Sequence, residues 1–144
     1  RVVNARIGVV LSKEGGALAK LLTPVKLGLG GPIGSGRQWM SWVSLRDAVR
    51  MLAAMVRDAE LRGPVNVVAG TVRQQQFMRT LGRVVHRPTI FPMPAVAVKA
   101  AFGAMGREVL LGSQRVTATR LPAGFAFRDT SLEEAIRGPL EPVG

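Results

Sequence analysis

The first eleven residues place the strongest constraint on the fold. Positions 2–11 read Val-Val-Asn-Ala-Arg-Ile-Gly-Val-Val-Leu, a run rich in β-branched and apolar side chains. Such a run is typical of a parallel strand that is covered on both faces. A strand of this kind needs neighbours, so we expect it to join a sheet that lies upstream of Arg1. The chain therefore reads as the second half of an α/β enzyme.

The following segments continue the alternation of helices and strands. A short helix over 15–22 is expected to end at Pro24, and Gly70-Thr71 is expected to form a turn. Residues 1–86 form the main α/β part, residues 87–137 a small α+β module that begins with three prolines, and 138–144 a tail. The further predicted elements are strands over 38–43 and 65–69 and helices over 46–59, 72–86, 95–102 and 130–136.

The helix predicted over 46–59 has the clearest apolar spacing. Its apolar residues Val49, Leu52, Ala53 and Val56 have the spacing of an amphipathic helix. Asp47 lies near the start of this helix. An acid in a first turn more often stabilises the helix dipole than acts as a general base.

Five of the ten residues at 27–36 are glycines, at positions 28, 30, 31, 34 and 36. This density indicates unusual backbone angles or close backbone approach. The spacing does not match the dinucleotide or P-loop fingerprints. Next to this loop, Trp39 and Trp42 are three residues apart on a predicted strand, so we expect one of them in the core and the other beside a pocket.

The charge of the chain is strongly positive, with 20 Lys and Arg against 9 Asp and Glu and a net charge of +11. No acid occurs between Leu61 and Arg107, and Arg79, Arg83 and Arg87 are spaced to form a basic ridge on a helix. Phosphates, an acidic partner subunit or water alone could face that ridge. The basic residues form no polybasic run and are not interleaved with aromatics, which argues against a nucleic-acid-binding domain.

The chain lacks the usual catalytic groups. It has no cysteine and no tyrosine, so thiol chemistry and a Tyr-x-x-x-Lys acid/base pair are excluded. Its single histidine, His86, cannot form a zinc site of the usual kind and falls at a predicted helix end. No apolar run is long enough to span a membrane. We therefore assign no catalytic residue and no metal ligand.

Several segments in order resemble one known family. They are 6–11, 15–18, 27–38, 63–66, 112–115 and 123–127. Together they resemble the C-terminal half of the epimerase-like atypical short-chain dehydrogenases. The resemblance implies a Rossmann-like extended short-chain dehydrogenase fold and NADP or NAD as cofactor. It also implies that an N-terminal half supplies the dinucleotide-binding loop and the acid/base residues.

The same resemblance implies roles for individual residues. Val10 and Leu11 would contact the cofactor through backbone and apolar contacts. The residues that would border the substrate pocket are Gly34, Arg37, Gln38, Trp39 and Trp42. Three positions depart from the family pattern: Ser12 replaces a glycine, Arg46 replaces an acid, and Val9 stands where nucleotide-sugar enzymes have an asparagine.

These observations leave three hypotheses for function. The first is a substrate-side portion of an NAD(P)-dependent epimerase/dehydratase-like oxidoreductase, completed by the N-terminal half or a companion chain. The second is a noncatalytic structural subunit of a large assembly, organellar, RNA-containing or respiratory. The third is an independent nucleic-acid-binding domain. The charge and Ser12 favour the second, whereas the glycine-rich loop favours the first, because a scaffold should not need five glycines. A cytoplasmic or organellar location, in mitochondria or chloroplasts, fits each.

Overall fold

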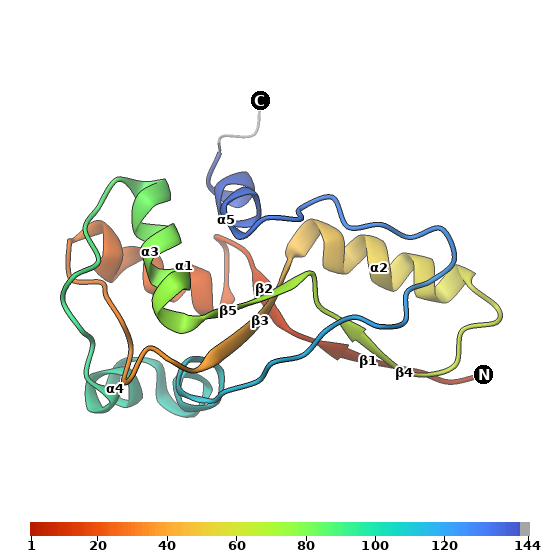
Figure 1. Ribbon diagram of the computed structural model, residues 1–144, viewed down its shortest axis with the longest axis horizontal. Coiled ribbons are helices and arrows are strands. Elements are labelled where there is room, and N and C mark those ends of the chain that lie inside the picture. Colours follow the sequence, from red (N-terminus) through yellow and green to blue (C-terminus); the bar gives the residue numbers. More distant parts are fainter. Residues whose placement is uncertain (142–144) are drawn as a thin grey trace.

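The computed structural model describes residues 1–141 and shows an elongated α/β molecule with two small sheets (Figure 1). In the first sheet, β1 (Val3–Ile7) pairs in parallel with β4 (Gly63–Val67). In the second, β3 (Trp39–Ser44) lies between β2 (Val9–Leu11), which is parallel to it, and β5 (Gly70–Arg73), which is antiparallel. The predicted α/β class is confirmed.

The helices are α1 (Gly16–Lys26), α2 (Leu45–Arg57), α3 (Gln74–Val85), α4 (Ala95–Gly106) and α5 (Leu132–Leu140), with a π-helix, η1 (Arg107–Leu111), directly after α4. Figure 1 shows α1, α3 and α4 at one end of the molecule, and β1, β4 and α2 at the other. No helix among residues 1–141 is both long and apolar enough to cross a membrane.

The single strand predicted over 2–11 is wrong, because the chain changes sheet at Gly8. The Gly8 N–H donates to the Val67 carbonyl oxygen at 3.2 Å, and a Cβ at this position would lie 2.7 Å from the Ser41 carbonyl oxygen. Any side chain at position 8 would clash with β3, so only glycine allows the chain to pass from β1 to β2 this close to β3. The expected cover on both faces is also absent from β1, where Ile7 is 47% exposed, although Leu11 at the end of β2 is fully buried.

The prediction that Pro24 ends the first helix is wrong as well. α1 continues to Lys26, and the Leu27 N–H donates to the Thr23 carbonyl oxygen at 3.2 Å. Proline removes only its own N–H donor, so residues after it can still bond to carbonyls in the last turn. The helix ends where Gly28 adopts a positive φ of 77°.

Two apolar clusters form the core. The larger lies between the β2–β3–β5 sheet and helices α1, α3 and α5, and includes Leu21, Phe77 and Ile136, all 0% exposed. The smaller lies between α2 and the β1–β4 pair and is built around Met51 and Val65. The helix predicted over 72–86 begins at Gln74 in the structure and contributes Phe77, Met78 and Leu81 to the larger cluster.

The apolar stripe that the spacing indicates on this helix is not the face that packs against the sheet. The buried residues of α2 are Asp47, Ala48, Met51 and Met55, and the last three belong to the smaller apolar cluster. The predicted stripe instead faces outward: Val49 is 58% and Val56 75% exposed. Helical spacing identifies an apolar stripe but not its occupant, and α2 has two apolar faces of which the described residues cover one.

The turn predicted at Gly70-Thr71 is wrong, because these residues begin β5. A Cβ at Gly70 would lie 2.9 Å from the Trp42 ring, so this glycine allows β5 to cross a buried indole.

The predicted basic ridge is only partly formed. α3 ends at Val85, and His86 follows it as predicted for a helix-end residue, with a left-handed φ of 56°. Arg87 therefore lies beyond the helix, and its Nε donates to the Lys26 carbonyl oxygen at 3.0 Å.

The region 87–137 contributes two further helices and η1. α4 runs past the predicted end at 102 and kinks at Gly103, and the predicted helix near 130–136 is α5, capped by Ser131, which accepts from the Glu134 N–H at 3.2 Å. α5 packs against α3 and the second sheet. The boundaries predicted at 86 and 137 therefore stay predictions, and residues 142–144 of the predicted tail lie outside the described residues.

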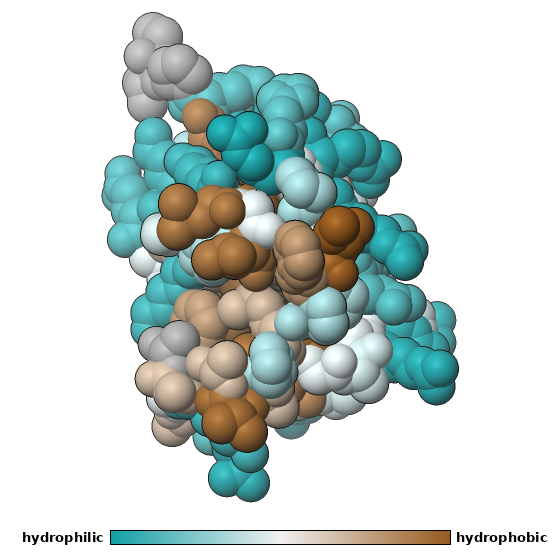
Figure 2. All heavy atoms as spheres, turned by 90° about the vertical axis from the view of Figure 1, so that its left-hand side faces the viewer, coloured by the Kyte–Doolittle hydropathy of each residue, from teal (hydrophilic) through white to brown (hydrophobic). Residues whose placement is uncertain are grey.

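Figure 2 shows the α1, α3 and α4 end face on. Hydrophobic atoms gather in the middle of this face, with hydrophilic atoms around them. The exposed large apolar side chains on the segments of this end are Leu27, Leu29, Ile90, Phe91 and Val96.

Candidate substrate and cofactor cleft

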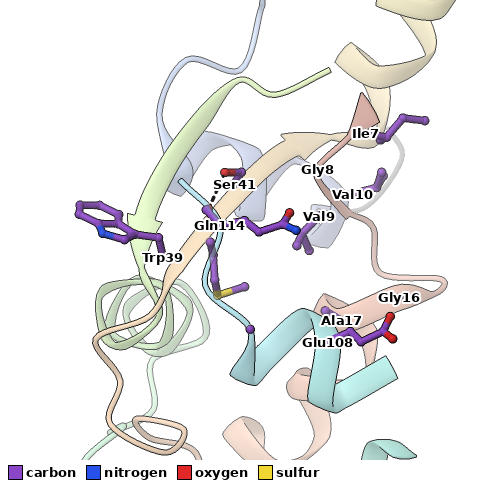
Figure 3. A pocket seen from close by; sticks show the side chains of 12 residues that line it. Ile7, Gly8, Val9, Val10, Gly16, Ala17, Trp39, Ser41, Glu108 and Gln114 are labelled. Atoms are coloured by element: carbon purple, nitrogen blue, oxygen red, sulfur yellow. Dashed lines mark hydrogen bonds between the residues drawn. The ribbon is translucent and has the colours of Figure 1, made fainter. Parts of the chain in front are cut away.

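A cleft of about 370 Å³ opens where β1 passes into β2 (Figure 3). One wall is formed by residues 7–10, the carboxyl end of β1 and the start of β2. The others are formed by the first residues of α1, by residues 39–41 of β3, and by Glu108, Gly112 and Gln114. Ligands of open α/β sheets bind outside the carboxyl ends of parallel strands, and this cleft lies at that end of β1.

A second cavity of about 570 Å³ lies between the carboxyl ends of β2 and β3 and helix α5. It is lined by Leu11 and by the pair Arg46 and Asp129, whose Nη2 and Oδ1 atoms are 2.6 Å apart. We place the candidate site in the first cleft, because only that cleft joins a predicted cofactor residue, Val10, to a predicted substrate residue, Trp39.

The two predicted cofactor residues occupy different environments. Val10 is half-buried and lines the cleft, next to Val9. Leu11 is 0% exposed and its side chain belongs to the larger core cluster. A ligand in the cleft can therefore contact the side chain of Val10 but not that of Leu11.

Of the five predicted substrate residues, only Trp39 lines the cleft. Its indole points away from Val9 and Val10 (Figure 3), and the guanidinium groups of Arg73 and Arg115 lie 4.1 and 4.5 Å from its ring centroid. Trp42 is the core tryptophan, at 2% exposure. Trp42 is thus the core member of the expected pair, and the pocket role of Trp39 stays a prediction.

Gln38 acts as a buried tie rather than as part of the cleft wall. Its Nε2 donates to the carbonyl oxygens of Ile33, at 3.0 Å, and Leu110, at 2.7 Å. The remaining two residues lie on the glycine-rich loop outside the cleft: Gly34 donates its N–H to the Met93 carbonyl oxygen, and Arg37 is exposed. Whether any of the five binds a substrate stays a prediction.

The glycine-rich loop has structural reasons for its composition. A Cβ at Gly31 would overlap the Phe91 carbonyl oxygen, and one at Gly30 would overlap the Val25 side chain. The other three glycines have positive φ angles, for example 68° at Gly36. The argument that a noncatalytic scaffold would not need these glycines is therefore wrong, because close packing at two of them and the positive φ of the other three require glycine whatever the function.

Sequence reasoning missed the polar residues of the cleft that come from the segment after α4. That segment is bonded to β3 in the manner of an added strand: the Trp39 N–H donates to Ser113 Oγ at 3.0 Å, the Gln114 N–H to the Trp39 carbonyl at 3.1 Å, and Ser41 Oγ to the Gln114 carbonyl at 2.8 Å. The Gln114 amide points toward Val9 (Figure 3). The partners are more than 70 residues apart, and no local pattern marks them.

Asp47 lies outside the cleft and serves the fold. Its Oδ2 accepts from the N–H groups of Arg128 and Asp129 at 2.9 and 2.8 Å, and its Oδ1 accepts from Arg50 Nη1 at 2.5 Å. Burial raises the pKa of this carboxyl, but the two N–H donors and the guanidinium outweigh that effect and leave the pKa below its ordinary value. Asp47 therefore ties α2 to the segment before α5. The described residues hold no cluster of His, Cys, Asp and Glu suited to a metal ion.

Comparison with known proteins identifies the relatives of the chain. A family model described as a domain of unknown function, DUF1731, matches residues 93–138. An epimerase family protein of Mycobacterium bovis is 46% identical over 138 residues, which are 94% of this chain and 46% of that protein. A chloroplastic homologue from Arabidopsis thaliana is 37% identical over 143 residues, 98% of this chain and 41% of that protein.

A solved structure supports the same assignment. A human epimerase family protein, determined with NADPH, superposes with a TM-score of 0.81 at 33% identity, covering 94% of this chain and 47% of the human one. The chain spans about half the length of the curated relatives it matches. In sequence and in fold, it matches the C-terminal portion of the epimerase-like atypical short-chain dehydrogenases.

Proposed function

We propose that the chain forms the substrate-side portion of an NAD(P)-dependent epimerase-like oxidoreductase, and that it needs a dinucleotide-binding half for catalysis. The observation that carries this proposal is the cleft at the carboxyl end of β1, where Val10, β3 and the segment 108–114 meet. The human relative that was solved with NADPH supports a nicotinamide cofactor for this fold.

The cleft residues suit the uncharged end of such a cofactor or substrate. Val9 and Val10 offer an apolar wall, and no Lys or Arg is among the described residues that line the cleft. The phosphates of NADP or NAD need N–H donors or cations, which the dinucleotide-binding half would supply. When bound, the nicotinamide would supply hydride transfer, and this chain would shape and dry one side of the site.

Two neighbouring surfaces fit the dinucleotide-binding half. Within the described residues β1 pairs with β4 only, so its other edge offers unpaired N–H and C=O groups to a further strand. The outward stripe of α2, formed by Leu45, Val49, Leu52 and Val56, lies on the helix that covers β1. A partner that extends the sheet beyond β1 and packs on α2 would bury both.

A cofactor titration tests the cleft. In the protein expressed from its complete gene, Val10→Arg should project a longer, charged side chain into the cleft and weaken NADPH binding at least about tenfold, because that side chain would occupy space that the cofactor needs. The matched control Val96→Arg changes an exposed valine of α4 and should leave binding unchanged. Equal NADPH affinity in wild type and Val10→Arg, with both folded by circular dichroism, would contradict the proposal.

A binding experiment tests the partner surface. The chain and the dinucleotide-binding half of the M. bovis relative are expressed as separate polypeptides, and their dissociation constant is measured. Val49→Asp with Val56→Asp should raise that constant about a hundredfold, since two charges would be buried without partners. The control Val96→Asp should not change it. If the double variant binds as tightly as the unmodified chain, the half does not pack on α2.

A further inference from the structure

The polar part of the cleft comes from the region of unknown function. Glu108 and Gln114 both lie in the segment 93–138 that matches the domain of unknown function, and both line the cleft opposite Val9 and Val10. Figure 3 shows the Glu108 side chain beside the start of α1 and the Gln114 amide directed toward Val9. A ligand bound in the cleft would therefore lie next to both side chains.

The backbone next to Glu108 is held by a hydrogen bond and by close packing. Glu108 lies in η1, and π-helical turns occur frequently at functional sites. The Leu110 carbonyl accepts from the buried Gln38 amide at 2.7 Å, and a Cβ at Gly112 would overlap the Glu108 carbonyl oxygen. The segment that carries Gln114 is fixed to β3 by its hydrogen bonds with Trp39 and Ser41. Both side chains therefore stand on supported backbone, as a binding site requires.

The charge of the cleft is opposite to that of the chain. The chain has a net charge of +11, yet Glu108 is the only charged side chain among the described residues that line the cleft. An ionised carboxylate accepts hydrogen bonds and cannot donate them, whereas the Gln114 amide can do both. A phosphate or carboxylate beside Glu108 would meet a like charge, and no cation among the described residues that line the cleft would compensate it.

From this we infer that Glu108 and Gln114 bind a hydroxyl- or amino-bearing, non-anionic part of the substrate. This inference rests on the proposed function of the cleft. Glu108 would accept a hydrogen bond from a ligand hydroxyl or ammonium group, and Gln114 would bond to a neighbouring hydroxyl. The anionic part of a nucleotide-linked substrate would lie away from Glu108.

Three sugars of the same ring size test the inference: D-glucosamine, which carries an ammonium group, neutral D-glucose, and anionic D-glucuronate. Each is titrated into the protein expressed from its complete gene, and the backbone amide signals of Ala17 and Gln114 are followed by NMR to place binding in the cleft. Glucosamine should bind about fivefold more tightly than glucuronate, the size expected of an exposed charge pair, with glucose in between.

Variants assign the preference to named side chains. Glu108→Gln keeps the shape of the side chain and should bring the glucosamine to glucuronate ratio close to one. Gln114→Ala should weaken all three sugars to a similar extent. The control Glu60→Gln removes the same charge from an exposed turn and should leave the ratio unchanged. A ratio that survives in Glu108→Gln, tighter binding of glucuronate, or no binding of any sugar at the cleft would each overturn the inference.

NADPH binding, measured on the same samples, separates this inference from the proposed function. Bound NADPH without the sugar preference overturns only the role of Glu108 and Gln114. If the wild type does not bind NADPH, the oxidoreductase proposal is contradicted. The glucosamine to glucuronate affinity ratio still tests the role of Glu108 in that case.

Discussion

The two sheets of the molecule are covered by helices to different degrees. The β2–β3–β5 sheet is packed by α1, α3 and α5, and its residues Leu11 and Trp42 are 0% and 2% exposed. The β1–β4 pair is packed by α2 alone among the helices, with Ile7 47% exposed on the strand and Val56 75% exposed on the helix. We call these the closed region and the open region. What sets the β1–β4 pair apart is that its exposed apolar side chains lie next to an unpaired strand edge of β1, and we propose this combination as the surface for the dinucleotide-binding half.

The largest expected effect comes from the centre of the closed region. Phe77→Ala removes the largest fully buried side chain and should lower the free energy of unfolding by about 3–5 kcal/mol. Val56→Ala on the outward stripe of α2 should change it by less than about 0.5 kcal/mol in the isolated chain. Urea denaturation measures both. Similar losses in the two variants would show that the stripe is already packed and would remove the distinction between the regions.

The next effect concerns the buried carboxylate of Asp47, which links α2 of the open region to the segment before α5. Asp47→Ala leaves two N–H donors and Arg50 without their buried acceptor, and should lower the free energy of unfolding by about 2–3 kcal/mol.

The same carboxyl gives the protein a dependence on acid. Because folding lowers the pKa of Asp47, its contribution is present above the unfolded value of about 3.9 and is lost as the pH falls further. The wild type should therefore lose stability below about pH 4 more steeply than Asp47→Ala, as measured by unfolding at a series of pH values. Asp58, whose pKa is lowered mainly by the Ala123 N–H, adds to the same dependence in both proteins. Parallel pH profiles would contradict the role of Asp47.

A smaller effect tests the packing of the glycine-rich loop. Gly31→Ala would force a Cβ against the Phe91 carbonyl oxygen and should cost about 1–3 kcal/mol in stability. Gly15→Ala has open space around its Cβ and an extended backbone, so it should cost little. Thermal unfolding compares the two. If Gly31→Ala is as stable as Gly15→Ala, the loop does not approach Phe91 as described.

The smallest effect concerns the stack around Trp39 at the edge of the closed region. Arg73→Ala removes one cation from the indole and should cost about 0.5–1 kcal/mol. Arg79→Ala, on the exposed face of α3, should be neutral within the error of chemical denaturation. A neutral Arg73→Ala would show that the stack contributes nothing to stability.

Local pattern predicted the order of helices and strands well, because most of these elements are amphipathic or β-rich segments of ordinary length. It failed where a distant contact decides the local structure. Gly8 interrupts a continuous apolar run because Ser41 and Val68 leave no room for a side chain. Gly70 resembles a turn residue but allows a strand to cross Trp42. The contacting residues, Ser41 and Val68 for Gly8 and Trp42 for Gly70, all lie far from the glycine in the sequence.

The cleft was only partly predictable. The family resemblance pointed to Val10 and Trp39, which both line the cleft, but it also pointed to residues that the structure places in the core or on the outer loop. Glu108 and Gln114 could not be found from spacing, since hydrogen bonds to β3 across about 70 residues bring their segment to the cleft. The stripe of α2 was visible in the sequence, but its outward direction depends on what covers it.

The most direct test of the central claim is native mass spectrometry of the protein isolated from its source, with sequencing of every polypeptide present. We predict a complex or a longer chain that includes a dinucleotide-binding half carrying a glycine-rich loop, with one NADPH or NADH bound. Recovery of the chain among unrelated proteins or RNA, without a dinucleotide-binding half and without bound nucleotide, would contradict the account and favour a structural subunit.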